Sequence, residues 1–153
     1  PWGPNTEQET HDFIAHCLLS AAAEDRMDYV FGVEFRDDPG LLGSVGLYLK
    51  HADDGQAMLG YAYGKAAWGR GIATEAARIM VAMGFDVLGL RRIWAACDPE
   101  NEGSKRVLEK VGMQIEGILR EDTVIRGEVR DTLVWGILEP EWRAGPQSER
   151  SNR

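Results

Sequence analysis

A glycine-rich stretch that runs without a break into a helical pattern constrains this chain more than any other feature of its sequence. The stretch reads Trp68-Gly69-Arg70-Gly71-Ile72-Ala73-Thr74-Glu75-Ala76. From its middle onward, apolar residues recur at spacings of three and four, which predicts an amphipathic helix with the stripe Ile72, Ala76, Ile79, Met80, Met83 and Val87. Upstream, the apolar and aromatic run 57–63 is bounded by glycines and predicts a strand. The expected order is therefore strand, glycine turn, helix.

The junction between this turn and the helix is a predicted anion-binding site. The first N–H groups of a helix have no partner within the helix, and the helix dipole places positive charge beside them. Glycines at positions 69 and 71 let the backbone come close to an anion. We therefore interpret the turn as a phosphate-binding loop, and the alternative is a strand-to-helix turn that binds no ligand.

Two familiar phosphate-binding motifs do not fit the spacing of this loop. A P-loop requires G-x-x-x-x-G-K-[ST], but Gly64-Lys65 is followed by Ala66, which has no hydroxyl for magnesium. A dinucleotide-binding turn requires G-x-G-x-x-G/A, whereas Thr74 stands at the third position. Leucine and two arginines at 90–92 also stand where that motif carries its ribose-binding acid. Each motif therefore lacks a residue that it requires, so neither describes this loop.

The part of the chain before the loop is predicted to form a helix and three strands. Thr6 with Glu9 three residues later is a capping box, and the stripe expected on the helix after it is Phe13, Ile14, Cys17 and Leu18. Strands at 29–35, 41–50 and 57–63 are separated by short turns, which predicts an antiparallel meander. One face of the second strand carries Val45, Leu47 and Leu49.

The part of the chain after the predicted central helix continues with a strand, a short helix and a hairpin. The continuous apolar run 93–97 is typical of a strand buried on both faces, and it should lie parallel to the strand before the loop. Asn101 is the expected N-cap of the short helix, which Gly112 ends. A long hairpin of 113–125 and 128–138 follows, with one face formed by Leu133, Trp135 and Ile137.

The loop resembles motif A of the GNAT superfamily of N-acetyltransferases, whose Q/R-x-x-G-x-G/A loop binds the pyrophosphate of coenzyme A on backbone amides. Trp68 replaces the usual Gln or Arg, and W-G-x-G-x-A-T-E-A resembles the RimJ/RimL-type branch (ribosomal-protein-alanine acetyltransferase-like), which acetylates protein N-termini and small amines. Residues 101–113 resemble the second GNAT signature, N-x-x-S-x-x-v-l-e-k-x-G-f, and residues 116–120 match the family's e-G-x-l-R. The resemblance covers about residues 40 to 140.

The resemblance implies an α/β fold of the GNAT acyl-CoA N-acyltransferase type, with an α+β mixed sheet. An antiparallel meander is joined in it to a parallel, splayed strand pair, with flanking helices. It implies one GNAT acetyltransferase domain over residues 1–142 and a polar C-terminal tail at 143–153. GNAT domains begin with a strand and a helix before the segment matched to residues 6–23. We therefore expect roughly 25 further residues before Pro1 in the natural protein, and an unpaired sheet edge along 29–35.

Acetyl-CoA or coenzyme A is the cofactor that the resemblance implies. The backbone from Arg70 to Thr74 is expected to hold the pyrophosphate, and pantetheine is expected to pair with backbone exposed between the splayed strands. A backbone N–H near residues 59–61 is the expected donor to the oxyanion. The full set of expected cofactor-binding residues is Leu59, Tyr61, Trp68, Gly69, Arg70, Gly71, Ile72, Ala73, Thr74, Asn101 and Ser104. For Asn101, helix capping alone is the alternative.

The implied chemistry is direct attack of a neutral amine on the thioester in a ternary complex, with no covalent enzyme intermediate. Ser104 is the candidate general acid for the leaving thiolate, and the alternative is a helix-start serine that bonds the backbone. Met58 stands where many relatives carry an acidic residue, and a thioether cannot accept a proton. The candidates left for the general base are Asp98, Asp131 and ordered water.

The charge balance narrows the classes of partner. Seventeen basic and twenty-five acidic residues give a net charge of −8, which argues against broad binding to nucleic acid or to an anionic membrane. An acidic surface suits a cationic acceptor, although a charge of this size also serves solubility. The resemblance implies a small-molecule or peptide amine as the partner, and we expect a monomer or a homodimer.

Cysteine and histidine spacing predicts no metal site. Cys17 and Cys97 lie outside any C-x-x-C motif and are interpreted as free thiols, which fits a reducing cytoplasm. His11 and His16 are five residues apart, which is not the i, i+4 spacing of a zinc pair. Apolar runs all fall short of the roughly 18 residues of a transmembrane helix. We therefore expect a cytoplasmic protein.

Three functional hypotheses follow. The first is an acyl-CoA-dependent N-acyltransferase that moves an acetyl group to a primary amine on a protein N-terminus or a small molecule. The second is a non-catalytic acyl-CoA-binding or regulatory domain, which Met58 at the expected base position suggests. The third is an interaction protein whose loop is only structural. Turnover with a panel of amines separates the first two, and coenzyme A binding separates both from the third.

Overall fold

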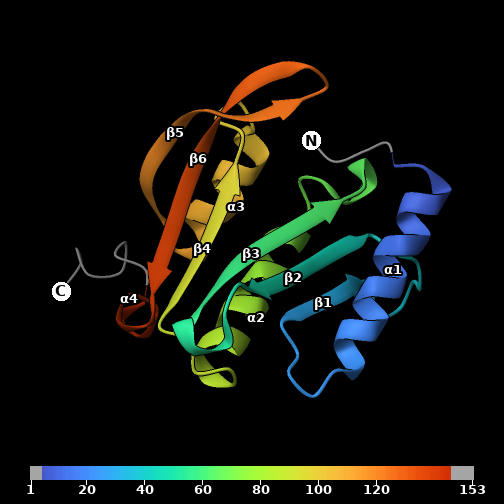
Figure 1. Cartoon of the computed structure of the whole chain (residues 1–153), viewed down its shortest axis with the longest axis horizontal. Helices are drawn as coiled ribbons and strands as arrows, with labels where there is room; N and C mark the ends of the chain where they lie inside the picture. Colours follow the sequence, from blue (N-terminus) through green and yellow to red (C-terminus); the bar gives the residue numbers. More distant parts are fainter. Residues whose placement is uncertain (1–4, 146–153) are drawn as a thin grey trace.

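The two halves of the chain build one mixed sheet. A computed structural model describes residues 5–145 (Figure 1). The helices and strands are α1 (Glu7–Ala22), β1 (Asp28–Val33), β2 (Gly43–Leu49), β3 (Gln56–Tyr63), α2 (Ile72–Asp86), β4 (Arg92–Cys97), α3 (Glu102–Val111), β5 (Gln114–Ile125), β6 (Glu128–Leu138) and α4 (Glu139–Ala144). The strand order is β1-β2-β3-β4-β6-β5. The predicted α/β class with a mixed sheet is therefore confirmed.

Strand pairing confirms the predicted meander, crossover and hairpin. β1 with β2 and β2 with β3 are antiparallel, whereas β3 and β4 are parallel. β6 returns beside β4 in the antiparallel direction, which places β5 at the far edge of the sheet. The hairpin turns at Arg126 and Gly127, which both have positive φ angles. α2 is the crossover element between the two parallel strands.

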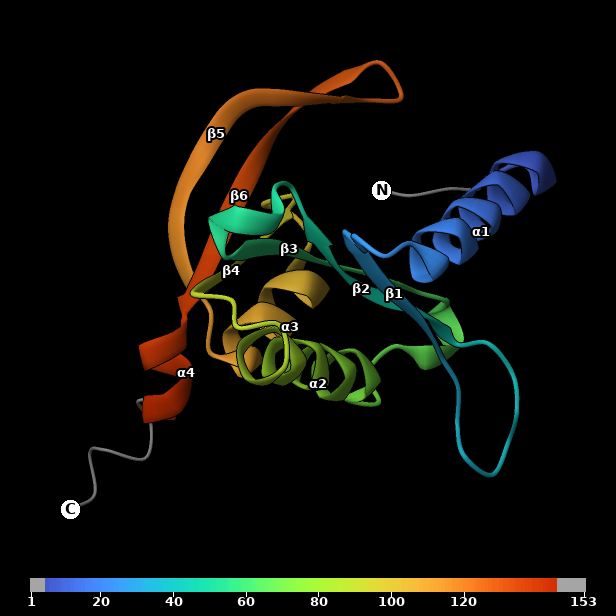
Figure 2. The same cartoon turned by 60° about the horizontal axis from the view of Figure 1, so that its bottom comes forward.

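The helices lie on both faces of the sheet, but the hydrophobic core lies on only one face (Figures 1 and 2). α2 and α3 pack on one face of β2, β3 and β4, while α1 lies over β1 on the opposite face. The strands contribute the core residues Val45, Leu47, Ala57, Leu59, Ile93, Ala95, Leu133, Trp135 and Ile137. We call the face that carries α1 the open face, because no helix within residues 5–145 covers β3 and β4 there.

The apolar stripe predicted for α2 is partly wrong. Ile79 and Val87 are 62% and 75% exposed. The buried side of the helix is instead formed by Ala76, Ala77, Met80, Val81, Gly84 and Phe85. Gly84 is buried, and its position requires glycine because a Cβ there would lie only 2.7 Å from the Ile93 side chain. Close packing against β2 and β4 therefore selects small residues, and these carry little weight in an apolar periodicity.

β4 and α1 also differ from their predicted burial. β4 alternates between buried and partly exposed positions, with Ile93 and Ala95 in the core and Ala96 exposed, so it is covered on one face only. α1 has the predicted capping box, in which the Thr6 hydroxyl accepts from the Glu9 N–H at 3.2 Å. The predicted stripe is partly wrong, because Phe13 and Cys17 are half-buried whereas Ile14 and Leu18 are exposed. α1 packs against the edge strand β1 and has no buried residue.

The ends of the domain are described only in part. β1 lies at one edge of the sheet, as expected for strand 29–35 among the described residues. α4 runs to Ala144, past the predicted domain boundary at 142, and residues 146–153 of the predicted tail lie outside the described residues. None of the helices in the part of the chain that the structure describes is long and apolar enough to span a membrane.

Candidate functional site

The parallel strands β3 and β4 separate after a short stretch of pairing. They pair only over Gln56–Met58 and Arg92–Trp94. β3 then continues to Tyr63 along β2, and β4 continues to Cys97 along β6. On the sides that face each other, β3 beyond Met58 and β4 beyond Trp94 are not paired in the described structure, a gap that Figure 1 shows between the two arrows. The splayed pair expected from the resemblance is therefore present.

The predicted phosphate loop lies at the end of β3 and leads into α2. Gly71 is the N-cap of α2 in a left-handed conformation with φ of 78°, and α2 receives no side-chain cap hydrogen bond. The first backbone bond of this turn runs from the Glu75 N–H to the Gly71 carbonyl at 3.0 Å. The N–H groups of residues 72–74 precede that bond and point out of the helix end. A Cβ at Gly69 or Gly71 would meet no atom within 4 Å, so space is open above the loop.

The side chains of the loop hold it against the end of the meander. The Trp68 indole N–H donates to the Tyr63 carbonyl at 3.0 Å, and the Trp68 side chain remains largely exposed. The Arg70 guanidinium lies 4.4 Å above the centre of the Phe35 ring, a cation–π contact. Neither contact involves a backbone N–H of residues 72–74. The loop residues predicted to bind the cofactor therefore lie together at one helix end.

Ser104 and Tyr61 meet beneath the splay. Asn101 caps α3 as predicted, because its side-chain oxygen accepts from the Ser104 N–H at 3.0 Å. The Ser104 hydroxyl lies 2.8 Å from the Tyr61 hydroxyl, and the two residues are 43 positions apart in the sequence. Burial raises the pKa of Tyr61 to about 12, with the Ser104 hydrogen bond acting in the opposite direction. Both hydroxyls therefore remain protonated at neutral pH and can donate.

Other polar groups of this region are also neutral. Burial raises the pKa of the Cys97 thiol, although the nearby Trp135 and Ser104 side chains act against burial. The Trp135 indole N–H is buried without a hydrogen-bond partner in the described structure, although its proximity lowers the pKa of the Cys97 thiol. The Tyr63 hydroxyl is buried without a partner in the described structure. A protonated thiol is a weaker nucleophile than a thiolate.

The two candidate bases are already engaged in structural contacts. Asp98 accepts from the Glu100 N–H at 2.8 Å and from the Arg130 guanidinium at 3.0 Å, and both interactions hold its pKa below the usual value. Asp131 is exposed and accepts from the Glu121 N–H at 2.9 Å, beside an irregularity in β5. These contacts lower the basicity of Asp98 and give both side chains a structural role. A role for either as general base stays a prediction.

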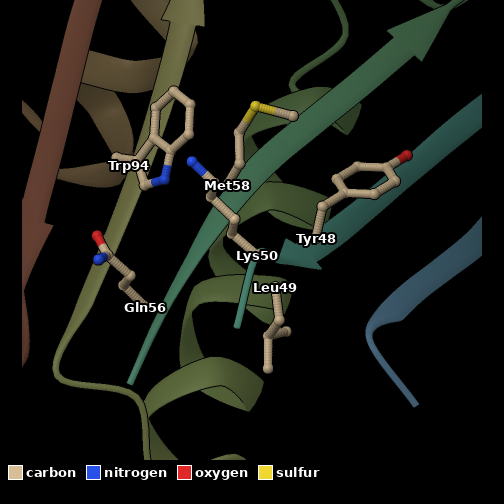
Figure 3. Close-up of a pocket in the computed structure, with 6 residues that line it drawn as sticks. All are labelled: Tyr48, Leu49, Lys50, Gln56, Met58 and Trp94. Carbon is tan, nitrogen blue, oxygen red and sulfur yellow. The ribbon is translucent and has the colours of Figure 1, made fainter. Parts of the chain in front are cut away.

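A pocket that sequence reasoning missed lies on the open face of the sheet. It has a volume of about 390 Å³ and is lined by Tyr48, Leu49, Lys50, Gln56, Met58 and Trp94 (Figure 3). Tyr48, Met58 and Trp94 are register partners across β2, β3 and β4, and Met58 pairs with Trp94 at the last position before the splay. Only the register brings these residues together, so no local pattern could have predicted the pocket.

No cluster of metal-binding side chains occurs among residues 5–145. His11 and His16 instead lie near carboxylates, and the His16 ring is 2.7 Å from Asp28.

A family described as "Acetyltransferase (GNAT) domain" matches residues 1–114 of the chain. Among curated relatives, the chain is 35% identical over 122 residues to "Uncharacterized N-acetyltransferase YoaA" of Bacillus subtilis (strain 168). The aligned segment covers 80% of this chain and 69% of the relative. The chain is 42% identical over 115 residues to "Probable N-acetyltransferase YjcK" of the same organism, which covers 74% of this chain. The chain spans only 64% of the length of YjcK.

Relatives whose names state an acceptor are more distant. "Spermidine N(1)-acetyltransferase" of Escherichia coli (strain K12) is 33% identical over 76 residues, which covers 50% of this chain and 41% of the relative. A ribosomal-protein-S5-alanine acetyltransferase from Vibrio fischeri has the same fold, with a TM-score of 0.80 at 21% identity over 93% of this chain and 80% of that chain.

Solved structures share the arrangement of strands and helices. A structure described as a probable acetyltransferase has a TM-score of 0.82 at 25% identity, over 92% of this chain and 78% of that chain. The microcin C7 self-immunity acetyltransferase MccE, solved in complex with acetyl-CoA and AMP, has a TM-score of 0.76 at 18% identity, over 88% and 72%.

Proposed function

The chain belongs to the GNAT acetyltransferase family, and on that basis we propose that it moves an acetyl group from acetyl-CoA to a primary amine. The observation that carries the proposal is the combination of two features. One is the splayed pair β3 and β4, and the other is the uncapped N-terminus of α2 at the end of β3. A helix end that lacks its own cap and has open space above it suits an anion.

The residues of this chain fit two parts of coenzyme A, the pyrophosphate and the pantetheine. The amides from Arg70 to Thr74 would hold the pyrophosphate, since Gly69 and Gly71 leave room for close approach. Backbone groups of residues 59–63 that face the gap would pair with pantetheine as a third strand would. The unpartnered Tyr63 hydroxyl at the end of β3 is a further donor that a ligand could satisfy.

Ser104 would act as the general acid. Acetyl-CoA would supply an activated thioester, and the amine nitrogen would bond to the acyl carbon while the carbon–sulfur bond broke. The Ser104 hydroxyl would give its proton to the leaving sulfur, the Tyr61 hydroxyl, 2.8 Å away, would pass its own proton to Ser104, and Tyr61 would regain a proton from water. A backbone N–H between Leu59 and Tyr61 would donate to the oxyanion. The proton lost by the amine would pass to water, because Asp98 and Asp131 are held in other contacts.

The branch and the acceptor are also part of the proposal. The loop motif from Trp68 to Ala76 supports the RimJ/RimL-type branch, whose acceptors are protein N-termini and small amines. Residues 1–142 would then act as one catalytic domain, as a monomer or a homodimer. A non-catalytic acyl-CoA-binding domain is the second candidate, since Met58 lies where an acidic residue is common in relatives.

Thiol release separates these functions. The protein is incubated with acetyl-CoA and a panel of amines that includes spermidine and short peptides, and free thiol is measured over time. The proposal predicts amine-dependent thiol release that exceeds hydrolysis. Calorimetric binding of acetyl-CoA without any amine-dependent release would support the regulatory alternative. Absence of binding at millimolar concentration would return the loop to a structural role.

A further inference from the structure

The pocket on the open face lies next to the point where β3 and β4 separate. Met58 and Trp94 form its floor at the last paired position of β3 and β4, directly before the gap that the cofactor is proposed to fill. Tyr48 and Gln56 stand beside them, and the Lys50 ammonium extends into the space between Met58 and Trp94 (Figure 3). Groups that line this pocket would therefore contact an amine that approached the gap from the open face.

The charge in this pocket is opposite to the charge of the chain. Its lining contains one cation, Lys50, and no carboxylate. None of the ion pairs within residues 5–145 involves Lys50. Two acids on neighbouring strands are paired with other groups, because Asp28 contacts His16 at 2.7 Å and Glu116 is bound by Arg92. Asp53 and Asp54 follow Lys50 in the chain but do not line the pocket. A chain with a net charge of −8 therefore presents an unpaired positive charge at this point.

The remaining walls of the pocket are apolar or neutral. Trp94 and Tyr48 offer aromatic faces, Met58 offers a thioether, and Gln56 offers an amide. Burial raises the pKa of Tyr48, so its phenol stays neutral and adds no negative charge. A polyamine would bring further positive charges against Lys50 with no acid to receive them, which disfavours it. An acceptor with an apolar segment and a carboxylate meets complementary groups on every side.

We propose, on the basis of the proposed acetyltransferase function, that this pocket takes an amine whose skeleton carries a carboxylate, such as a peptide N-terminus followed by an acidic residue. Lys50 is the residue that selects this acceptor over a polyamine. This assignment reverses the expectation from net charge alone, which favours a cationic acceptor. The difference arises because the acidic residues lie outside the pocket, while the one charge inside it is positive.

A matched pair of peptides tests the selection by charge. Alanyl-glutamyl-phenylalaninamide and alanyl-glutaminyl-phenylalaninamide differ in one carboxylate, and spermidine serves as the polyamine. The parent protein should favour the glutamyl peptide over both others by about tenfold in kcat/KM. Lys50→Gln should reduce the preference to within about twofold, and Lys50→Glu should reverse it. Lys110→Gln makes the same change of net charge at the far end of α3 and should keep the preference.

The outcome that overturns the inference is equally defined. A preference for spermidine in the parent, or an unchanged peptide ratio in Lys50→Gln, would contradict it. High salt provides an independent check, because a preference that arises from one charge pair at a pocket mouth should shrink as ionic strength rises.

A binding measurement separates this inference from the proposed function. The Met58 methyl signal, assigned with Met58→Leu, is followed by NMR while the two peptides are added separately. A shift with the glutamyl peptide alone that disappears in Lys50→Gln supports the ligand class even if no amine is acetylated, and then only the proposed activity fails. Turnover of both peptides at equal rates with equal shifts overturns the inference and leaves the activity standing.

Discussion

The helices α2 and α3 begin in equivalent places but treat their N-termini in opposite ways. Each follows one strand of the splayed pair, α2 after β3 and α3 after β4. α3 satisfies its first turn internally, because Asn101 accepts from the Ser104 N–H at 3.0 Å and Glu102 adds an acid at its positive end. α2 starts at Gly71, which has no side chain to offer and makes no cap.

This difference explains how two helix N-termini in equivalent places can have two different functions. Every helix end carries unpaired N–H groups and a positive dipole, so the feature alone does not make a ligand site. At α3 the chain supplies the acceptor itself, and the turn is free to hold Ser104 against Tyr61. At α2 the chain supplies the acid Glu75 in the first turn but no side-chain cap, and a ligand can accept from the free N–H groups. We therefore assign anion binding to α2 and proton transfer to α3.

The change with the largest expected effect is Gly71→Val at the start of α2. A ligand held by two or three charge-assisted hydrogen bonds, of about 1.5–3 kcal/mol each, should lose about 100-fold or more in affinity when a branched side chain blocks close approach. Calorimetric titration with coenzyme A measures this loss. Gly89→Val is the matched control, since Gly89 also has positive φ and open space but lies beyond the other end of α2. An unchanged affinity in folded Gly71→Val would refute the assignment.

Ser104→Ala should impair the proton transfer assigned to α3, whereas Gly71→Val should impair the anion binding assigned to α2. Loss of a general acid should lower turnover by roughly 10- to 100-fold while coenzyme A affinity changes by less than about threefold. Tyr61→Phe keeps the ring but removes the neighbouring hydroxyl, and it should cause a smaller loss of turnover. Steady-state rates and calorimetry on the same preparations measure both quantities. A Ser104→Ala rate within about twofold of the parent would leave the serine with only its structural contacts.

Asn101→Ala should affect stability rather than binding. Removal of an N-cap typically lowers the free energy of unfolding by about 1 kcal/mol, and Asn101→Asp should lose only a few tenths because aspartate also caps. Urea unfolding measures the difference between the two variants. Coenzyme A affinity should be unchanged in both. A tenfold weaker affinity at unchanged stability would instead make Asn101 a cofactor ligand.

The smallest expected effect concerns Asp98, which fixes the loop before α3. Its pKa is lowered by the Glu100 N–H and the Arg130 guanidinium, so the carboxylate stabilises the folded state above its unfolded pKa of about 3.9. Asp98→Asn should therefore be less stable than the parent by about 0.5–1 kcal/mol at pH 7. The difference should shrink as the pH falls below about 3.9 and disappear once it has passed through the lowered pKa. Urea unfolding across this range checks the sign, and a difference that does not shrink with falling pH would be inconsistent with it.

Local features of the fold could be predicted from sequence, because they depend on neighbours in the chain. The capping box of Thr6, the N-cap Asn101 and the hairpin turn at Arg126 each involve residues within a few positions. Burial was predicted less well. Ile79 is apolar but faces solvent, while Gly84 is buried against Ile93, because the packing distance between α2 and the sheet decides both positions.

The features of the candidate site also differ in whether the sequence alone could predict them. The phosphate loop is one continuous stretch, so its glycines could be found by motif. The contact of Ser104 with Tyr61 and the row of Tyr48, Met58 and Trp94 depend on the crossover and the strand register, which no local pattern contains. The end of pairing between β3 and β4 was expected only from the family resemblance.

An NMR titration of the backbone amides tests the central difference between the two helix ends most directly. Uniformly ¹⁵N-labelled protein is titrated with coenzyme A and, separately, with pantetheine, which lacks the pyrophosphate. We predict large shifts for the amides of Ile72, Ala73 and Thr74 with coenzyme A and none of comparable size with pantetheine. The amides of Glu102 and Gly103 should respond equally to both ligands. Pyrophosphate-dependent shifts at the start of α3, with an unperturbed start of α2, would contradict the account.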